Sequence, residues 1–211
     1  MKEQEIKIKL CGFQSIEPAV VAAEEGVDYL GFVFVPGNKY YIEPFQAKQI
    51  IDEVRRFNTG IVGIFIDEQV ETINSVIRSV GLTHVQLHGN EPPEYCRYID
   101  GAKIIKAFGV DNNVNTVELL DRLSRYSVDF YIIDRIQRGS GSMVPFTFAK
   151  EVARQYPIFL AGGITAENVL PIIREVNPFG IDVASGVDTD GRKNTAKIKE
   201  LISLIKGKGQ K

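Results

Sequence analysis

The chain has 211 residues, of which 44% are hydrophobic and 25% are charged. These values are ordinary for a folded protein and exclude an intrinsically disordered chain. Lys and Arg number 25 and Asp and Glu number 27, so the net charge of −2 argues against nucleic-acid binding dominated by phosphate contacts. The length predicts a single domain over residues 1–211, because α/β barrels of this size form one domain.

The chain lacks the patterns of membrane and secreted proteins. No apolar run approaches the roughly 18 residues of a membrane span, and the first residues lack the apolar stretch of a signal peptide. We therefore expect a cytoplasmic protein without a membrane or nucleic-acid partner. Cys11 and Cys96 fit a reducing compartment, and Cys96 is expected to pack inside a helix over 91–100. Together with His84 and His88 they form no CxxC or HExxH motif, so no metal site is expected.

Short apolar, β-branched runs recur along the whole chain and predict strands. Between them lie segments in which apolar residues are spaced by three or four, as in amphipathic helices. Ser15 is a candidate start of the first helix and Thr165 of the seventh. The expected strands are Ile6–Leu10, Tyr29–Phe34, Ile61–Phe65, His84–Leu87, Lys103–Phe108, Val128–Ile133, Pro157–Leu160 and Gly180–Ala184.

A strand followed by a helix, repeated eight times, predicts a parallel sheet. Eight units in about 200 residues fit a (β/α)₈ barrel, also called a TIM barrel. A doubly wound open sheet is the alternative, although no GxGxxG motif follows the first strand. The Lys- and Gly-containing segment from about residue 206 is expected to be a frayed tail.

In such barrels the chemistry lies at the carboxyl ends of the strands. Cys11 ends the first run, His88 follows the fourth and Asp134 follows the sixth. The thiol and the carboxyl group provide a candidate base and acid for proton transfer in one pocket. The alternatives are a buried cysteine that only packs, a carboxylate that caps a loop and a structural histidine.

Glycine-containing turns follow the last three strands. They are Gly139-Ser140-Gly141, Gly162-Gly163 and Ser185-Gly186. Glycine lets the backbone approach a ligand closely, and consecutive N–H groups then converge on an anion. Although each could be only a turn, three on consecutive strands favour a phosphate site.

Several segments together resemble the phosphoribosylanthranilate isomerase family of tryptophan biosynthesis. They occur in the family's order and at matching separations, nearly from end to end. The matching segments are Lys9-Leu10-Cys11-Gly12, Leu30-Gly31-Phe32-Val33-Phe34, Val85-Gln86-Leu87-His88-Gly89-Asn90-Glu91, Ile132-Ile133-Asp134, Leu160-Ala161-Gly162-Gly163-Ile164, Glu167-Asn168-Val169 and Gly180-Ile181-Asp182-Val183-Ala184-Ser185-Gly186-Val187.

The resemblance implies a phosphate-binding (β/α)₈ barrel that catalyses an Amadori rearrangement of a phosphoribosyl amine. By position, Asp134 is then the general acid that opens the furanose ring, and Cys11 is the base that removes the C2 proton. No metal or organic cofactor is implied. The substrate-binding residues implied are Lys39, Tyr40, His88, Gly141, Gly163, Asp182, Ser185 and Gly186.

Two segments depart from the family pattern. Tyr40 occupies the place of an arginine that binds the anthranilate carboxylate, and Lys39 precedes it. After Gly141 the chain continues Ser-Met-Val-Pro instead of Gly-Lys-Thr-Phe. Lysine does not replace the two-pronged guanidinium of arginine. Two alternatives therefore stay open, an isomerase for another phosphoribosyl amine and a non-catalytic phosphate-ligand binder. The chain is expected to be a monomer or a homodimer.

Overall fold

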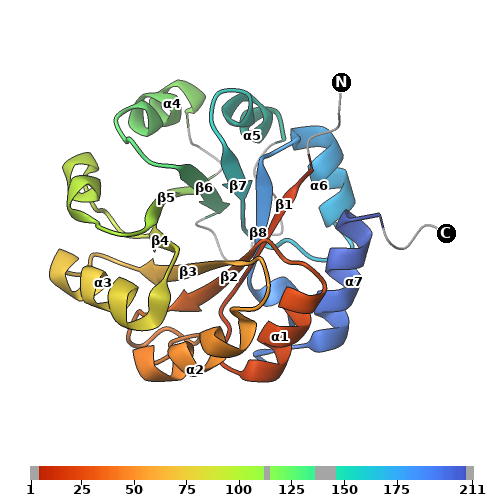
Figure 1. Ribbon diagram of the computed structural model, residues 1–211. Coiled ribbons are helices and arrows are strands. Elements are labelled where there is room, and N and C mark those ends of the chain that lie inside the picture. Colours follow the sequence, from red (N-terminus) through yellow and green to blue (C-terminus); the bar gives the residue numbers. More distant parts are fainter. Residues whose placement is uncertain (1–4, 112–114, 136–145, 208–211) are drawn as a thin grey trace.

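A computed structural model describes residues 5–111, 115–135 and 146–207. In this part of the chain, eight parallel strands close into a barrel in the order β1 to β8, with helices forming an outer ring (Figure 1). The strands are β1 Lys7–Cys11, β2 Tyr29–Val33, β3 Gly60–Phe65, β4 His84–Leu87, β5 Lys103–Val110, β6 Phe130–Arg135, β7 Ile158–Leu160 and β8 Gly180–Val183.

The first and last strands pair directly, with Lys9 opposite Asp182 and Leu10 opposite Val183. This pairing closes the barrel and excludes the open doubly wound sheet. The predicted fold class is thereby confirmed, and every expected strand limit lies within two residues of the observed one.

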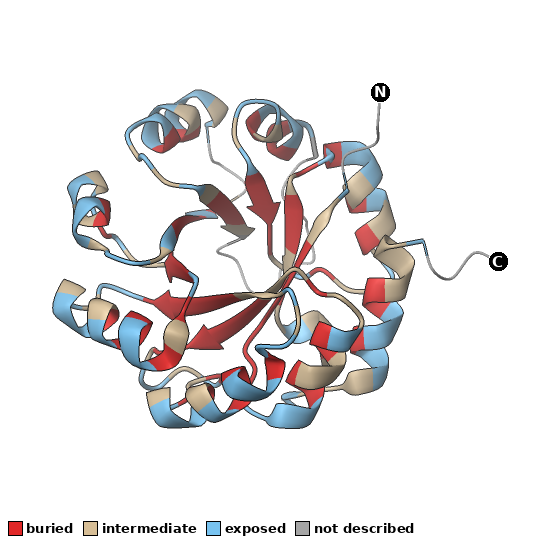
Figure 2. Cartoon of the chain, in the orientation of Figure 1, coloured by how far each residue is buried: buried red, intermediate tan, exposed pale blue. Residues whose placement is uncertain are grey.

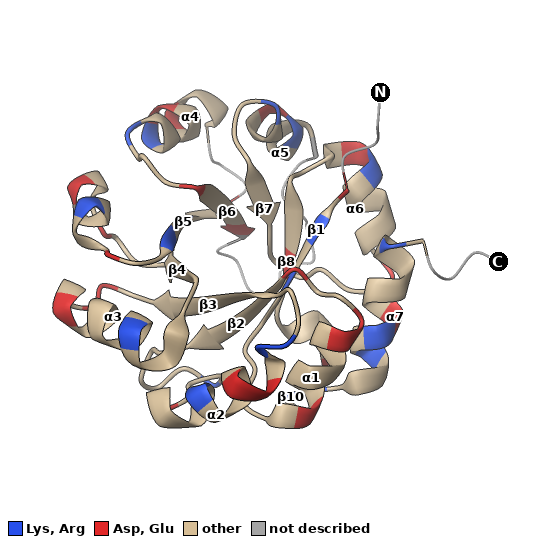
Figure 3. Cartoon of the chain, viewed as in Figure 1, with Lys and Arg blue, Asp and Glu red and all other residues tan. Residues whose placement is uncertain are grey.

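The helices alternate with the strands and cover their outer surface (Figure 1). Their apolar residues face the barrel, whereas their charged residues face outward (Figures 2 and 3). The α-helices are α1 Ile16–Glu24, α2 Pro44–Val54, α3 Val70–Val76, α4 Thr116–Ser124, α5 Phe146–Ala153, α6 Val169–Val176 and α7 Thr195–Ile205. Among the described residues, no helix has the length and apolar character needed to span a bilayer.

The segment expected to be a helix over 91–100 is instead a short 3₁₀ helix, η2 Pro93–Tyr98. Glu91 stays outside it because its carboxylate accepts N–H groups of Asp67 and Gly89 and pairs with Lys106 at 2.7 Å. Two consecutive prolines also remove N–H donors at its start. Cys96 lies in η2 and is buried, as expected.

The expected helix starts were only partly correct. Ser15 occupies the N-cap position of α1, but its side chain makes no capping bond. Thr165 does not cap α6; it lies one turn earlier, and its N–H donates to the Asn168 side chain at 2.9 Å. Asn168 itself is the residue before the first helical position.

Other short elements follow from local geometry. After α3 the helix widens into a π-turn, η1 Ile77–Gly81. After β8 come a 3₁₀ turn, η3 Ser185–Val187, and a hairpin of β9 Asp188–Thr189 and β10 Arg192–Lys193. Asp190 and Gly191 form its turn with φ of +51° and +75°, which is the Asp-Gly signal of a two-residue hairpin. Helix α7 ends at Ile205; of the tail expected from 206, residues 208–211 lie outside the described residues.

The core has two layers. One lies between the helices and the strands; the other fills the barrel with side chains such as Val62, Ile105 and Phe159. Three polar residues of the strands, Lys9, Gln86 and Lys106, are also almost fully buried. Buried polar groups need partners, and the partners of these three lie near the carboxyl ends of the strands.

Candidate active site

A cavity of about 510 Å³ opens at the carboxyl ends of the strands. It brings together Cys11 and Asp134, from β1 and β6, and the loops after β2, β7 and β8. All the sequence-predicted site residues that the structure describes line it; Gly141 lies outside the described residues. The lining residues of that set are Cys11, Lys39, Tyr40, His88, Asp134, Gly163, Asp182, Ser185 and Gly186.

Cys11 is a free thiol, 8% exposed, at the end of β1. Its sulfur packs against Gly31 of β2, where a methyl group would approach it to 2.9 Å. Burial raises the pKa of the Cys11 thiol, and the Lys9 ammonium opposes that rise. The thiolate, which is the basic form, therefore depends on the nearby cation.

Lys9 is fully buried, and its Nζ lies 2.8 Å from Asp182 Oδ1. Burial is the largest single influence and lowers the pKa of Lys9, but Asp182 together with Cys11 and Asp134 raises it above its ordinary value. Lys9 is therefore a permanent cation near Cys11. Sequence patterns do not single out Lys9, because only barrel closure brings β1 beside β8.

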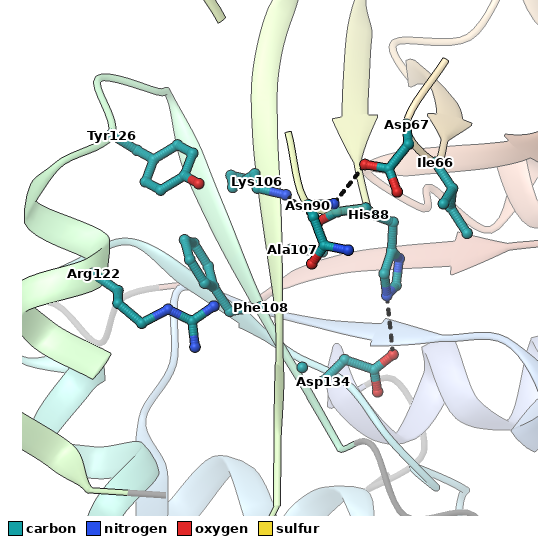
Figure 4. A pocket seen from close by; sticks show the side chains of 12 residues that line it. Ile66, Asp67, His88, Asn90, Lys106, Ala107, Phe108, Arg122, Tyr126 and Asp134 are labelled. Atoms are coloured by element: carbon teal, nitrogen blue, oxygen red, sulfur yellow. Dashed lines mark hydrogen bonds and ion pairs between the residues drawn. The ribbon is translucent and has the colours of Figure 1, made fainter. Parts of the chain in front are cut away.

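His88 stands between Gln86 and Asp134. Gln86 Nε2 donates to His88 Nδ1 at 2.8 Å, and His88 Nε2 lies 3.6 Å from Asp134 Oδ2 (Figure 4). Burial lowers the pKa of His88 despite the nearby Asp134, which favours the neutral imidazole. Because Nδ1 accepts a hydrogen bond, the single ring proton lies on Nε2 and faces the Asp134 carboxylate.

Tyr40 is buried and does not extend into solvent. Its hydroxyl donates to Asp188 Oδ2 at 2.5 Å. The ammonium groups of Lys39 and Lys193 lie 4.4 Å and 4.5 Å from the centre of its ring. Lys193 also pairs with Asp188 at 2.7 Å. Two lysines thus lie where the resemblance implies an arginine, although Lys193 is already paired with Asp188, and Lys193 was not found from the sequence.

Glycines shape the loops after β7 and β8. Gly162 and Gly163 adopt φ of +98° and +69°, which favours glycine. A methyl group at Gly186 would overlap the carbonyl oxygen of Ile164. These two loops therefore lie in close contact, and their glycines line the cavity. Such a wall suits a phosphate group.

A second cavity, of about 580 Å³, adjoins the first. His88, Asp134 and Ile66 line both (Figure 4). Its outer wall carries Arg122, whose guanidinium lies 5.3 Å from the centre of the Phe108 ring. Sequence patterns did not indicate this cavity. In the part of the chain that the structure describes, no group of three or more His, Cys, Asp or Glu residues is arranged to hold a metal ion.

The whole arrangement matches one known family. The model of N-(5'-phosphoribosyl)anthranilate isomerases matches residues 8–203. The chain belongs to this family. An N-(5'-phosphoribosyl)anthranilate isomerase of Trichlorobacter lovleyi is 39% identical over 207 residues, which cover 95% of this chain and 98% of the relative.

Solved structures of the family agree with the fold. One is of monomers derived from the dimeric phosphoribosylanthranilate isomerase of Thermotoga maritima, with 34% identity, a TM-score of 0.83 and coverage of 96% of this chain and 99% of that chain. Another, with the same identity, TM-score and coverage, is a phosphoribosyl anthranilate isomerase in complex with reduced 1-(o-carboxyphenylamino)-1-deoxyribulose 5-phosphate. The resemblance drawn from the sequence is thereby confirmed.

Proposed function

We propose that this protein catalyses the Amadori rearrangement of N-(5'-phosphoribosyl)anthranilate to the 1-deoxyribulose 5-phosphate derivative in tryptophan biosynthesis. The observation that carries this proposal is that Cys11 and Asp134 line one cavity together with the glycine loops after β7 and β8, in a chain of this family. The family's biosynthetic role also supports the expected cytoplasmic location.

In the first step, Asp134 acts as the general acid. It gives its proton to the furanose ring oxygen while the bond between that oxygen and C1 breaks. The lone pair of the substrate nitrogen forms the C1=N bond, so a protonated Schiff base results. The imidazole N–H of His88, 3.6 Å from the carboxyl oxygen, favours the carboxylate that remains.

In the second step, Cys11 acts as the general base. Its thiolate removes the proton from C2, and the electron pair moves into a C1=C2 bond, which neutralises the nitrogen. The resulting enol becomes the ketone by proton transfer. Lys9 supports this step because its ammonium favours the thiolate.

The two ends of the substrate bind on different loops in this proposal. The phosphate binds at Gly163, Ser185 and Gly186, and the anthranilate carboxylate binds near Lys39 and Lys193. Asp182 lines the cavity while holding Lys9. Binding of the remote phosphate helps to orient the reacting carbons.

The replacement of the family arginine by Tyr40 favours a second candidate function. A tyrosine whose hydroxyl is bound to Asp188 cannot form the two-pronged contact of arginine with a carboxylate. An isomerase acting on a phosphoribosyl amine without that carboxylate fits this feature, and a phosphate-ligand binder without catalysis is the remaining alternative.

Complementation tests the proposal. The gene should restore growth without tryptophan to a strain that lacks this isomerase, whereas the gene carrying both Cys11→Ser and Asp134→Asn should not. Failure of the wild-type gene, with the protein present in the cells, would favour the alternative functions. Light scattering of the purified protein distinguishes monomer from homodimer; the dimeric relative from Thermotoga maritima supports the homodimer.

A further inference from the structure

The side-chain oxygen of Gln86 has no hydrogen-bond partner among the described residues. The residue belongs to β4, is 2% exposed, and lines the cavity that contains Cys11 and Asp134. Its Nε2 donates to His88. Its Oε1 is the one buried side-chain oxygen or nitrogen of the described residues that has no hydrogen-bond partner.

Such an atom destabilises the folded protein, because the amide oxygen loses its bonds to water on folding and regains none. The residues opposite Gln86 on the neighbouring strands are Ile64 and Ile105, so an aliphatic side chain would fit this layer of the barrel. A buried polar atom kept without a partner at the wall of an active-site cavity indicates a ligand that completes it.

We infer that Gln86 Oε1 accepts a hydrogen bond from the ribosyl amine part of the substrate, an inference that rests on the proposed function. The oxygen accepts and cannot donate. At neutral pH the carboxylate has no proton to give, and the phosphate, whose second pKa is about 6, is mostly the dianion. The donors that remain are the ribose hydroxyls and the amine N–H.

The place of Gln86 in the barrel agrees with this chemistry. In a ring of eight strands, β4 lies across from β8, whose loop carries Ser185 and Gly186. A substrate with its phosphate at that loop extends its sugar toward β4. The same amide holds His88 beside Asp134, so Gln86 aligns the sugar and the acid together.

The test compares two ligands in the full-length protein. Gln86→Met keeps the length of the side chain and removes both polar atoms, and Gln86→Leu is a second variant. Calorimetry measures the Kd of reduced 1-(o-carboxyphenylamino)-1-deoxyribulose 5-phosphate, which has the sugar hydroxyls and the amine, and of inorganic phosphate, which probes only the phosphate loop. Gln155→Met, at an exposed position before β7, is the matched control.

Both Gln86 variants should bind the analogue at least tenfold more weakly, with the Kd of phosphate changed less than twofold. Their melting temperatures should change little, because the gain from removing the unpartnered oxygen opposes the loss of the Nε2 hydrogen bond to His88. The control should match the wild type in all three measurements. An equal loss of affinity for both ligands, or no loss, overturns the inference.

Turnover by the wild-type protein is measured in parallel. No turnover by the wild type overturns the proposed function, whereas unchanged Gln86 variants of an active enzyme overturn only the inference.

Discussion

Lys9 sets how readily the Cys11 thiol ionises. Burial raises the pKa of the thiol, the Lys9 cation lowers it, and the Asp182 carboxylate raises it by a smaller effect. In the proposed mechanism the base is the Cys11 thiolate, whose fraction grows with pH. We therefore expect kcat/KM to rise from neutral into alkaline pH.

Removing the buried ion pair should move this rise to higher pH. The double variant Lys9→Met/Asp182→Asn avoids leaving an unpaired buried carboxylate, which would destabilise the protein strongly. The double variant removes Lys9, which lowers the pKa of Cys11, together with Asp182, which raises it by less. The pKa of Cys11 should therefore rise. A pH profile of kcat/KM measures the shift, and a profile that stays in place would show that Lys9 does not act on the thiol.

Lys39 is expected to bind the anthranilate carboxylate. Lys39→Ala should raise KM at least tenfold, which corresponds to roughly 1.4 kcal/mol. Tyr40→Arg should keep or improve binding, because arginine restores the family's contact. Lys48→Ala, which removes an exposed lysine paired with Asp52 on α2, is the control. An unchanged KM for Lys39→Ala together with a sharp gain for Tyr40→Arg would favour a different substrate.

At the level of the elements, the N-cap residue of α7 forms capping hydrogen bonds, whereas the N-cap residue of α1 forms none. The Asn194 side chain accepts N–H groups of Ala196 and Lys197, whereas Ser15 makes no capping bond at α1. Asn194→Ala should lower the free energy of unfolding by about 1 kcal/mol. Ser15→Ala should leave it nearly unchanged. Urea denaturation compares the two, and equal losses would show that the capping bond does not contribute.

The strands were predictable because each one is marked by a local run of residues, and the barrel was predictable because eight such runs alternate with helices. Each strand is a short apolar run, and the topology follows from regular alternation with helices. The helix expected over 91–100 is a shorter 3₁₀ helix, Pro93–Tyr98, because Glu91 is held by tertiary contacts with Lys106 and the backbone. The β9–β10 hairpin was missed although Asp190-Gly191 signals its turn.

The site was predictable in part for the same reason. Cys11 and Asp134 stand at strand ends, where the fold class places chemistry. Lys9 and Gln86 stand inside strands, where the sequence alone does not reveal which way a polar side chain points. The partner of Lys9, Asp182, is 173 residues away along the chain, and only closure of the barrel brings them together.

For the molecule as a whole, His84 limits stability in acid. It is buried against the rings of Tyr29 and Phe130, and burial, then Lys103, lowers its pKa from 6.5 to about 4. Between these pH values, His84 is therefore protonated in the unfolded chain but stays neutral in the folded chain. Stability falls as the pH drops through this range, by about 2 kcal/mol from pH 7 to pH 5.

His84→Phe should remove this part of the acid sensitivity while keeping an aromatic ring in the packing. Urea denaturation at pH 7, 6 and 5 gives the two slopes. The loss between pH 7 and pH 5 should be smaller for the variant than for the wild type. Equal losses would assign the acid sensitivity to other groups.

Turnover of N-(5'-phosphoribosyl)anthranilate by the purified full-length protein, measured for the wild type, Cys11→Ser and Asp134→Asn, tests the proposed chemistry most directly. The wild type should convert the substrate, and each variant should be slower by on the order of 10²–10⁴-fold with an unchanged melting temperature. Near wild-type rates in both variants would contradict the assignment of Cys11 and Asp134 as base and acid, and no conversion by the wild type would contradict the proposed function.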